Sequence, residues 1–114
     1  MIADKTYNGW TNYETWAAKL WMDNDQGSYW QDAAQEAWDD TEADGTFTHT
    51  ENATITLARR LKDEFEEANP LADDSSIWSD LLSAAISEIN WDEIAKSLIE
   101  DGDFEDEEED DDEG

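Results

Sequence analysis

The sequence predicts an all-α protein, a compact bundle of four or five short helices followed by a disordered acidic tail. Three observations support this prediction. At several points a serine or threonine precedes a glutamate or glutamine by three residues, which is typical of helix N-termini. Apolar residues then recur every three or four positions, the period of an α-helix. Seven tryptophans in 114 residues also indicate a folded core, because disordered acidic chains contain few aromatic residues.

The first two helices are predicted over residues 12–23 and 29–40. Thr11 and Glu14 form the expected capping box of the first helix, and Ser28 and Gln31 form that of the second. Turn-forming residues at 23–27 separate the two. The residues expected to be buried are Tyr13, Trp16, Ala17, Leu20 and Trp21 in the first helix, and Trp30, Ala33, Ala34, Ala37 and Trp38 in the second.

The third helix is predicted to begin after Thr48, with Glu51 completing a capping box, and to end near Ala68 before Asn69-Pro70. Its apolar stripe consists of Thr54, Ala58, Leu61, Phe65 and Ala68. A short β-hairpin at 45–57 is the less favoured alternative, because the helical stripe continues to Phe65.

A fourth helix is predicted to start from a cap within 73–76 and to run to about Ile89, and Asn90 is the expected N-cap of a short fifth helix. The apolar residues of the fourth helix are Ile77, Trp78, Leu81, Leu82, Ala85, Ile86 and Ile89. Those of the fifth helix are Trp91, Ile94, Ala95, Leu98 and Ile99. We expect most of the tryptophans to lie in the core, with one or two exposed near acidic residues.

The charge is the most unusual property of the chain. Six basic residues face 33 acidic residues, which gives a net charge of −27. Eleven of the acids lie in residues 101–114, so residues 1–100 retain 22 acids and all six bases. We therefore predict a helical domain at 1–100 and a low-complexity acidic tail at 101–114. Because such self-repulsion destabilises a compact state, the acidity indicates either a partner or a salty environment.

Composition excludes several classes of function. The chain has no cysteine and a single histidine, His49, so disulfides, thiol nucleophiles and cysteine-bound zinc are absent. No residues form a catalytic constellation, and we predict that the protein is not an enzyme and has no cofactor. No apolar run approaches the length of a membrane span, and no signal sequence is present, which predicts a cytoplasmic protein without a membrane partner.

A calcium loop is one alternative for the acidic segment 40–51. Asp40, Asp44, Gly45 and Glu51 match the spacing of an EF-hand loop, whereas Glu42 is longer than the residue preferred at its position. Glu51 is also required by the capping box of the third helix. We favour the capping role and predict no metal site.

The segment Asn8-Gly-Trp-Thr-Asn-Tyr-Glu-Thr-Trp16, with Leu20-Trp21 after it, resembles a family of small acidic proteins of phages and mobile elements. Residues 80–95 resemble a second block of the same family. The resemblance implies no catalytic residue, but it implies a genomic setting in which anti-defence proteins are common. In composition alone, the chain is similar to phage DNA mimics that block restriction enzymes.

We therefore predict a DNA-mimic inhibitor of the anti-restriction or anti-CRISPR type. Its carboxylates would occupy the DNA-binding groove of a basic host protein, a defence or DNA-processing protein, without the inhibitor itself binding nucleic acid. The expected contact residues form three acidic clusters. They are Asp39, Asp40, Glu42 and Asp44; Asp63, Glu64, Glu66 and Glu67; and Asp73, Asp74 and Asp80.

Two other interpretations of the acidity remain open at this stage. An acidic surface also keeps a protein soluble at high salt, and a flexible acidic tail suits a chaperone-like binder of a basic protein. A homodimer would lengthen a charged array, although nothing in the sequence specifies one.

Overall fold

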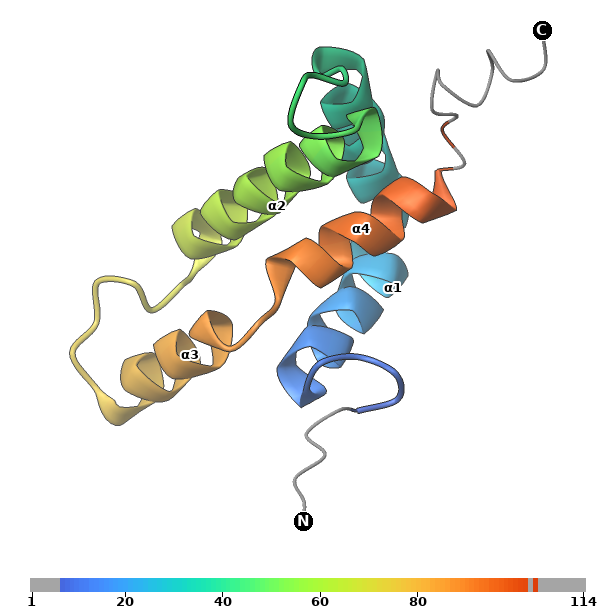
Figure 1. The fold of residues 1–114 in the computed structure, drawn as a ribbon. Coiled ribbons are helices and arrows are strands. Elements are labelled where there is room, and N and C mark those ends of the chain that lie inside the picture. The colour runs from blue at the N-terminus through green and yellow to red at the C-terminus, as the bar shows by residue number, and fades with distance from the viewer. Residues whose placement is uncertain (1–6, 103, 105–114) are drawn as a thin grey trace, which may run out of the picture.

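The computed structural model describes residues 7–102 and Phe104, and within them the fold is all-α, as predicted. Its four helices are α1 (Tyr13–Asp40), α2 (His49–Ala68), α3 (Ile77–Ser87) and α4 (Trp91–Asp101). Helices α1, α2 and α4 pack against one another and form the core. Helix α3 stands to one side of them, at the end of the loop that follows α2 (Figure 1).

The two helices predicted at 12–23 and 29–40 correspond to the two segments of α1, which meet at a kink at Gln26. The backbone of Gln26 is non-helical, with φ −142° and ψ 45°. The predicted turn at 23–27 therefore coincides with the interruption of the helix, and core residues lie on both sides of it, Met22 before it and Trp30 after it. The predicted cap at Ser28 is not observed, because the non-helical residue is Gln26, two positions earlier.

The N-cap of α1 is Asn12, and the predicted cap at Thr11 is also wrong. Asn12 Oδ1 accepts a hydrogen bond of 2.9 Å from the amide of Thr15. The other predicted helix starts are confirmed. The capping box of α2 is complete, since Thr48 and Glu51 each accept a bond from the other's amide, and Ser76 and Asn90 cap α3 and α4. The alternative hairpin at 45–57 does not form.

The buried faces agree with the prediction in the second half of α1 and in α4, where all ten predicted residues are buried. In the first half of α1 the prediction is wrong, since Tyr13, Leu20 and Trp21 are exposed. Thr15, Lys19 and Met22 are buried there instead. These three residues share one helical face, and Lys19 is neutralised by Asp23, whose carboxylate lies 2.8 Å from Nζ.

Aromatic rings join the three core helices. Phe65 of α2 lies between Trp30 of α1 and Trp91 of α4, with ring centroids 5.3 and 5.2 Å away and nearly parallel planes. Both tryptophans are buried, as is Trp38. Trp10 and Trp16 are half-buried, and Trp21 and Trp78 are exposed. The expectation of a tryptophan core therefore holds fully for three of the seven.

A polar clasp ties the start of α1 to the start of α4. Thr15, which is completely buried, donates from Oγ1 to Asn12 Oδ1 at 2.6 Å and accepts from the amide of Asn90 at 2.9 Å. Asn12 donates to the carbonyl of Glu88 at 2.8 Å, and the Thr11 amide donates to Glu93 at 3.0 Å. The clasp thus connects the N-terminal end of α1 to residues that lie 75 or more positions later in the sequence.

Replacing Thr15 with valine is expected to lower the free energy of unfolding by about 1–3 kcal/mol, because the partly buried amide of Asn90 loses its acceptor. Urea denaturation followed by circular dichroism measures the change. Thr15→Ser is the matched control, since it keeps the hydroxyl and removes only a methyl group. If serine were as destabilising as valine, packing rather than the clasp would account for the loss.

The C-terminal end of the described chain packs on the core. Helix α4 ends at Asp101, and the ring of Phe104 stacks on Trp38 with centroids 5.4 Å apart. Residues 103 and 105–114, most of the predicted acidic tail, lie outside the described residues, and the domain boundary at residue 100 stays a prediction. None of the helices in the described part of the chain has the length and apolar character needed to cross a membrane.

Candidate functional site

An acidic stripe runs along the solvent face of the second half of α1 and continues into the loop that follows. Its residues are Asp32, Glu36, Asp39, Asp40, Glu42 and Asp44, and all six are exposed. The first four are spaced i, i+4, i+7 and i+8, so they lie on one side of the helix. The opposite side is the one that enters the core through Ala33, Ala34, Ala37 and Trp38. The stripe therefore lies on a helix whose opposite face is packed in the core.

The sequence prediction named four residues of the stripe and missed Asp32 and Glu36. Their helical spacing relative to Asp39 and Asp40 could have revealed them, because it places all four on the face opposite the predicted core residues. The stripe also lies in an unusually negative part of the sequence. Residues 20–58 contain nine acids and no lysine or arginine.

Asp44 fixes the shape of the loop at the end of the stripe. Its Oδ1 accepts from the amides of Thr46 and Phe47, both at 2.7 Å, and Oδ2 accepts from the side chain of Asn52 at 3.3 Å. Hydrogen bonds to Asp44 lower its pKa below the ordinary value of 3.8. The largest effect comes from the backbone amide of Phe47, followed by the backbone amide of Thr46 and the side-chain amide of Asn52. These hydrogen bonds to the ionised carboxylate stabilise the folded protein fully above the ordinary pKa of Asp44. The stabilisation is lost as the pH falls through the lowered pKa of the folded state.

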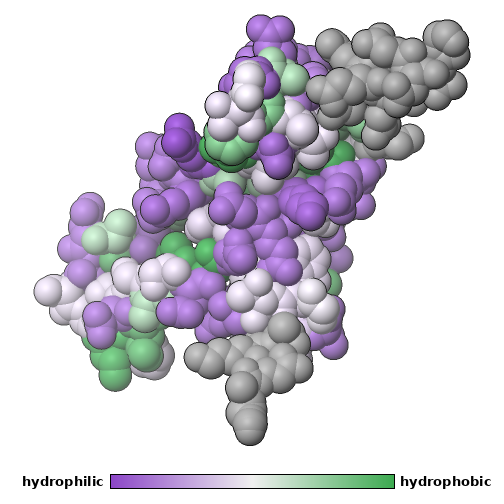
Figure 2. Space-filling model, viewed as in Figure 1, coloured by the Kyte–Doolittle hydropathy of each residue, from purple (hydrophilic) through white to green (hydrophobic). Residues whose placement is uncertain are grey.

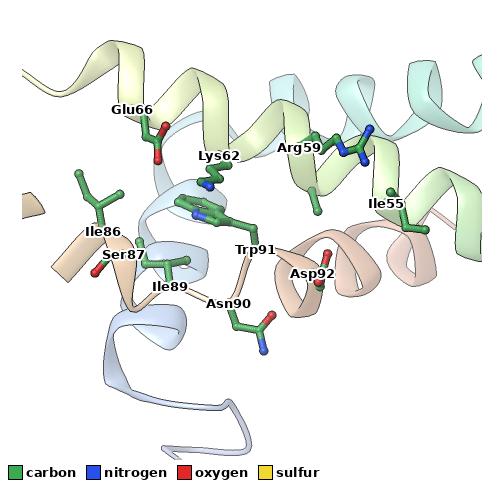
Figure 3. Close-up of a pocket in the computed structure, with 11 residues that line it drawn as sticks. Ile55, Arg59, Lys62, Glu66, Ile86, Ser87, Ile89, Asn90, Trp91 and Asp92 are labelled. Atoms are coloured by element: carbon green, nitrogen blue, oxygen red, sulfur yellow. The ribbon is translucent and has the colours of Figure 1, made fainter. Parts of the chain in front are cut away.

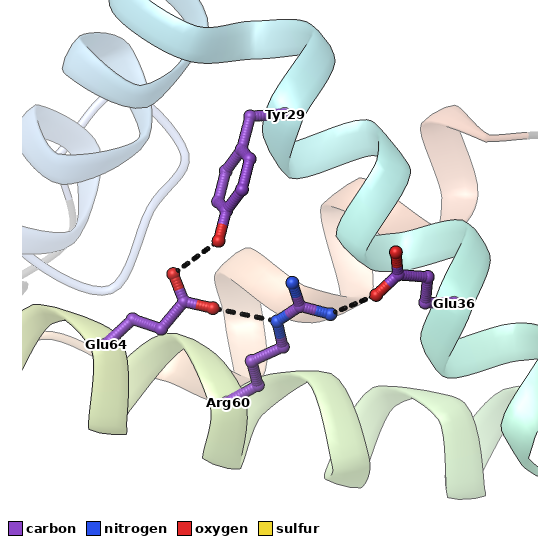
Figure 4. A network of polar contacts seen from close by, with 4 residues as sticks. All are labelled: Tyr29, Glu36, Arg60 and Glu64. Carbon is purple, nitrogen blue, oxygen red and sulfur yellow. Dashed lines mark hydrogen bonds and ion pairs between the residues drawn. The ribbon is translucent and has the colours of Figure 1, made fainter.

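Arg60 neutralises part of the stripe and connects it to α2 (Figure 4). Its Nη1 lies 2.7 Å from Glu36 Oε1, and its Nε lies 2.8 Å from Glu64 Oε2. The hydroxyl of Tyr29 donates to the other oxygen of Glu64 at 2.8 Å. Hydrogen bonds to Glu64 and then to Glu36 raise the pKa of Arg60 above its ordinary value. Glu36 and Glu64 therefore hold α1 to α2 and are less available to a partner.

The second predicted cluster contacts the stripe through Glu64. Asp63, Glu66 and Glu67 are exposed near the C-terminal end of α2, whereas Glu64 is half-buried in the Arg60 network. The stretch of α2 between this cluster and the stripe, residues 52–62, contains no acid and carries Arg59, Arg60 and Lys62. Glu64 contacts the stripe residue Glu36 through Arg60, whereas no ion pair within the described residues joins Asp63, Glu66 or Glu67 to the stripe.

The third predicted cluster lies farther away, on the loop before α3 and on α3 itself (Figure 1). Asp73, Asp74 and Asp80 are all exposed, and Asp74 and Asp80 line a shallow polar pocket with serines 75, 76, 79 and 83. Of the three clusters, only the first therefore belongs to the acidic stripe.

Two cations line a pocket of about 550 Å³ between α2 and the junction of α3 with α4 (Figure 3). Arg59 and Lys62 approach it from α2, and Trp91 and Ile86 form its apolar floor. Glu66 and Asp92 are also part of its lining. Within residues 7–102 and Phe104, neither Arg59 nor Lys62 forms an ion pair, so this side of α2 differs in charge from the stripe.

His49, the single histidine of the chain, lies inside the protein. Its ring stacks on Trp38 at 3.5 Å, and its Nε2 lies 2.8 Å from the carbonyl oxygen of Trp38. His49 is 5% exposed, so its imidazole supports the packing of α2 on α1 and faces no open surface.

Two of the carboxylates that match an EF-hand loop, those of Asp44 and Glu51, accept hydrogen bonds from backbone amides. Asp44 bonds to the amides of Thr46 and Phe47, and Glu51 Oε1 accepts from the amide of Thr48 at 2.9 Å. In the part of the chain that the structure describes, no three carboxylate or imidazole groups gather in a metal-binding arrangement.

Tryptophan fluorescence is expected to stay unchanged when calcium is added to about 1 mM, the weak end of EF-hand affinities. The reason is that calcium would have to displace the amide bonds of both Asp44 and Glu51. Asp44→Asn serves as the control variant. A calcium response of the natural protein that this variant loses would show that the loop does bind the metal.

Comparison with known proteins identifies a family but no described relative. The model of a family of unknown function matches residues 3–110, nearly the whole chain. No curated protein and no solved structure matches this chain.

Proposed function

Because the chain belongs to DUF7249, a family of unknown function, we propose its function from its own surface. The proposal is that the protein is a stoichiometric inhibitor whose acidic stripe imitates the phosphate backbone of DNA. Its target is a basic DNA-binding protein of the host, such as a restriction or CRISPR effector. The resemblance of residues 8–16 and 80–95 to small acidic phage proteins supports this anti-defence setting.

The spacing of the acidic stripe is the observation that carries the proposal. From Asp32 to Asp40 the helix rises roughly 12 Å, at about 1.5 Å per residue. Four carboxylates over that rise give a mean of one charge per roughly 4 Å of helix axis, or roughly 6 Å when Glu36, which is paired with Arg60, is left out, compared with ~3.4 Å of axis per charge for one DNA strand. A groove lined with lysine and arginine to bind a DNA strand can therefore pair with these carboxylates instead.

Rigidity strengthens such an imitation, because a preorganised array loses little conformational entropy on binding. The helix beneath the stripe is fixed by buried Trp30 and Trp38, and Asp44 fixes the loop that extends it. Net charge alone would attract any cationic protein, whereas a fixed spacing favours those that bind nucleic acid.

Affinity capture with competition by DNA tests this function. The full chain is immobilised, exposed to a host lysate in dilute buffer, and eluted with duplex DNA. We expect DNA to release the retained protein, and we expect about 1 M salt to release it too, because screening then acts within ~3 Å. A retained protein that salt releases but DNA does not would indicate a general binder of basic proteins. Retention of nothing would overturn the proposal.

A further inference from the structure

Helix α3 presents an apolar face that its own chain leaves uncovered. Ile77, Trp78 and Leu81 are 67%, 69% and 56% exposed, although the sequence predicts them to be buried. They are spaced within one helical turn of each other and lie on one side of α3. Hydrophobic residues gather at the corresponding edge of the molecule in Figure 2. Patches of this kind in a folded protein usually mark an interaction site.

The same helix is almost free of charge in a protein with a net charge of −27. Between residues 75 and 87 the single charged residue is Asp80. A cationic partner would be drawn to the acidic clusters and would gain little from this face. A second copy of the chain, which is equally negative, is repelled wherever acids face each other and can approach most closely where they are absent.

We propose that two copies of the protein associate through α3, which packs against α3 of the second copy in an antiparallel, two-fold symmetric pair. In such an interface each patch of Ile77, Trp78 and Leu81 covers the equivalent patch of the partner. The dimer does not depend on the DNA-mimic proposal, because it uses a surface remote from the acidic stripe. It would present two stripes in one particle.

The charges at the two ends of α3 favour the antiparallel arrangement. Asp73 and Asp74 precede the N-terminal end of the helix, and Asp80 lies in its first turn. The C-terminal end adjoins the pocket lined by Arg59 and Lys62, to which Ile86 and Ser87 of α3 also belong (Figure 3). That end also carries acids, Glu66 and Asp92 in the pocket lining and Glu88 at the C-cap, so an antiparallel pair places the purely acidic end of each helix toward an end of mixed charge in the other. A parallel pair would oppose acids to acids.

Sedimentation equilibrium of the full chain at low and high salt tests the dimer. We expect a monomer–dimer equilibrium with a dissociation constant below about 1 mM. It should tighten as salt is raised from about 50 to 500 mM, because screening reduces the repulsion between two highly negative chains. This dependence is opposite to that expected for binding through the acidic stripe, so the two proposals can fail separately.

The variant Leu81→Glu is expected to weaken the dimer by more than about tenfold, because it places a charge in the apolar interface. Trp21→Ala is the matched control, since Trp21 is 68% exposed but lies on α1, and it should leave the dimer unchanged. Circular dichroism confirms that both variants fold. A natural protein that stays monomeric at both salts, a species larger than a dimer, or a Leu81→Glu variant that dimerises normally would each overturn the proposal.

Discussion

Replacing Trp91 with alanine is expected to lower the free energy of unfolding by about 3–5 kcal/mol, the range for large aromatic residues in a core. Trp91 is 8% exposed and stacks on Phe65, which in turn stacks on Trp30. Removing its indole therefore takes away a contact between α2 and α4 and interrupts the aromatic series that reaches α1. A loss of this size approaches the whole stability of many small domains.

Urea denaturation followed by circular dichroism measures this loss, and Trp21→Ala provides the matched control. Both variants lose an indole from a helix, but Trp21 is mostly exposed, so its replacement should change the free energy of unfolding by less than about 0.5 kcal/mol. Equal losses in the two variants would show that the aromatic stack does not dominate the core.

Neutralising the acidic stripe is expected to abolish capture of a DNA-binding target. The triple variant Asp32→Asn, Asp39→Asn, Asp40→Asn keeps the volume of each side chain and removes three charges that the Arg60 network does not engage. If each contributes about 1 kcal/mol to the complex, the affinity falls at least about 100-fold. Folding should be preserved, because like charges at this spacing on a helix repel one another.

The matched control removes the same number of charges elsewhere. Asp73→Asn, Asp74→Asn, Asp80→Asn alters the third acidic cluster, which lies apart from the stripe. Titration of each variant against the captured target, in the same buffer, compares the two. A control that loses as much affinity as the stripe variant would mean that net charge, and not the spacing of the stripe, attracts the target.

The starts of three helices could be predicted from sequence because a cap is a local structure. Thr48, Ser76 and Asn90 each bond to an amide three residues ahead, so all the atoms involved lie within one turn. The cap of α1 was misassigned because Thr11 and Asn12 both have suitable side chains. Thr11 instead contacts Asn90 and Glu93, residues about 80 positions away.

The exposure of the apolar face of α3 could not be predicted from sequence, for a different reason. Its apolar spacing resembles that of a core helix, and the sequence does not reveal that α2 and α4 already cover each other and α1. The acidic site shows the same limit. Helical spacing would have been sufficient to find Asp32 and Glu36, which the prediction missed, but the contacts that tie Glu36 and Glu64 to Arg60 depend on how α1 meets α2.

By itself, the sequence determined the helical class, three of the four helix starts, the core residues of α4 and of the second half of α1, and the strong negative charge. These properties follow from composition and from contacts within about one helical turn. Only the tertiary structure decided which apolar faces are covered, which carboxylates are neutralised, and that the first two predicted helices follow each other directly across a kink. Those outcomes depend on contacts between residues distant in sequence, such as Thr15 with Asn90, whose geometry no local spacing encodes.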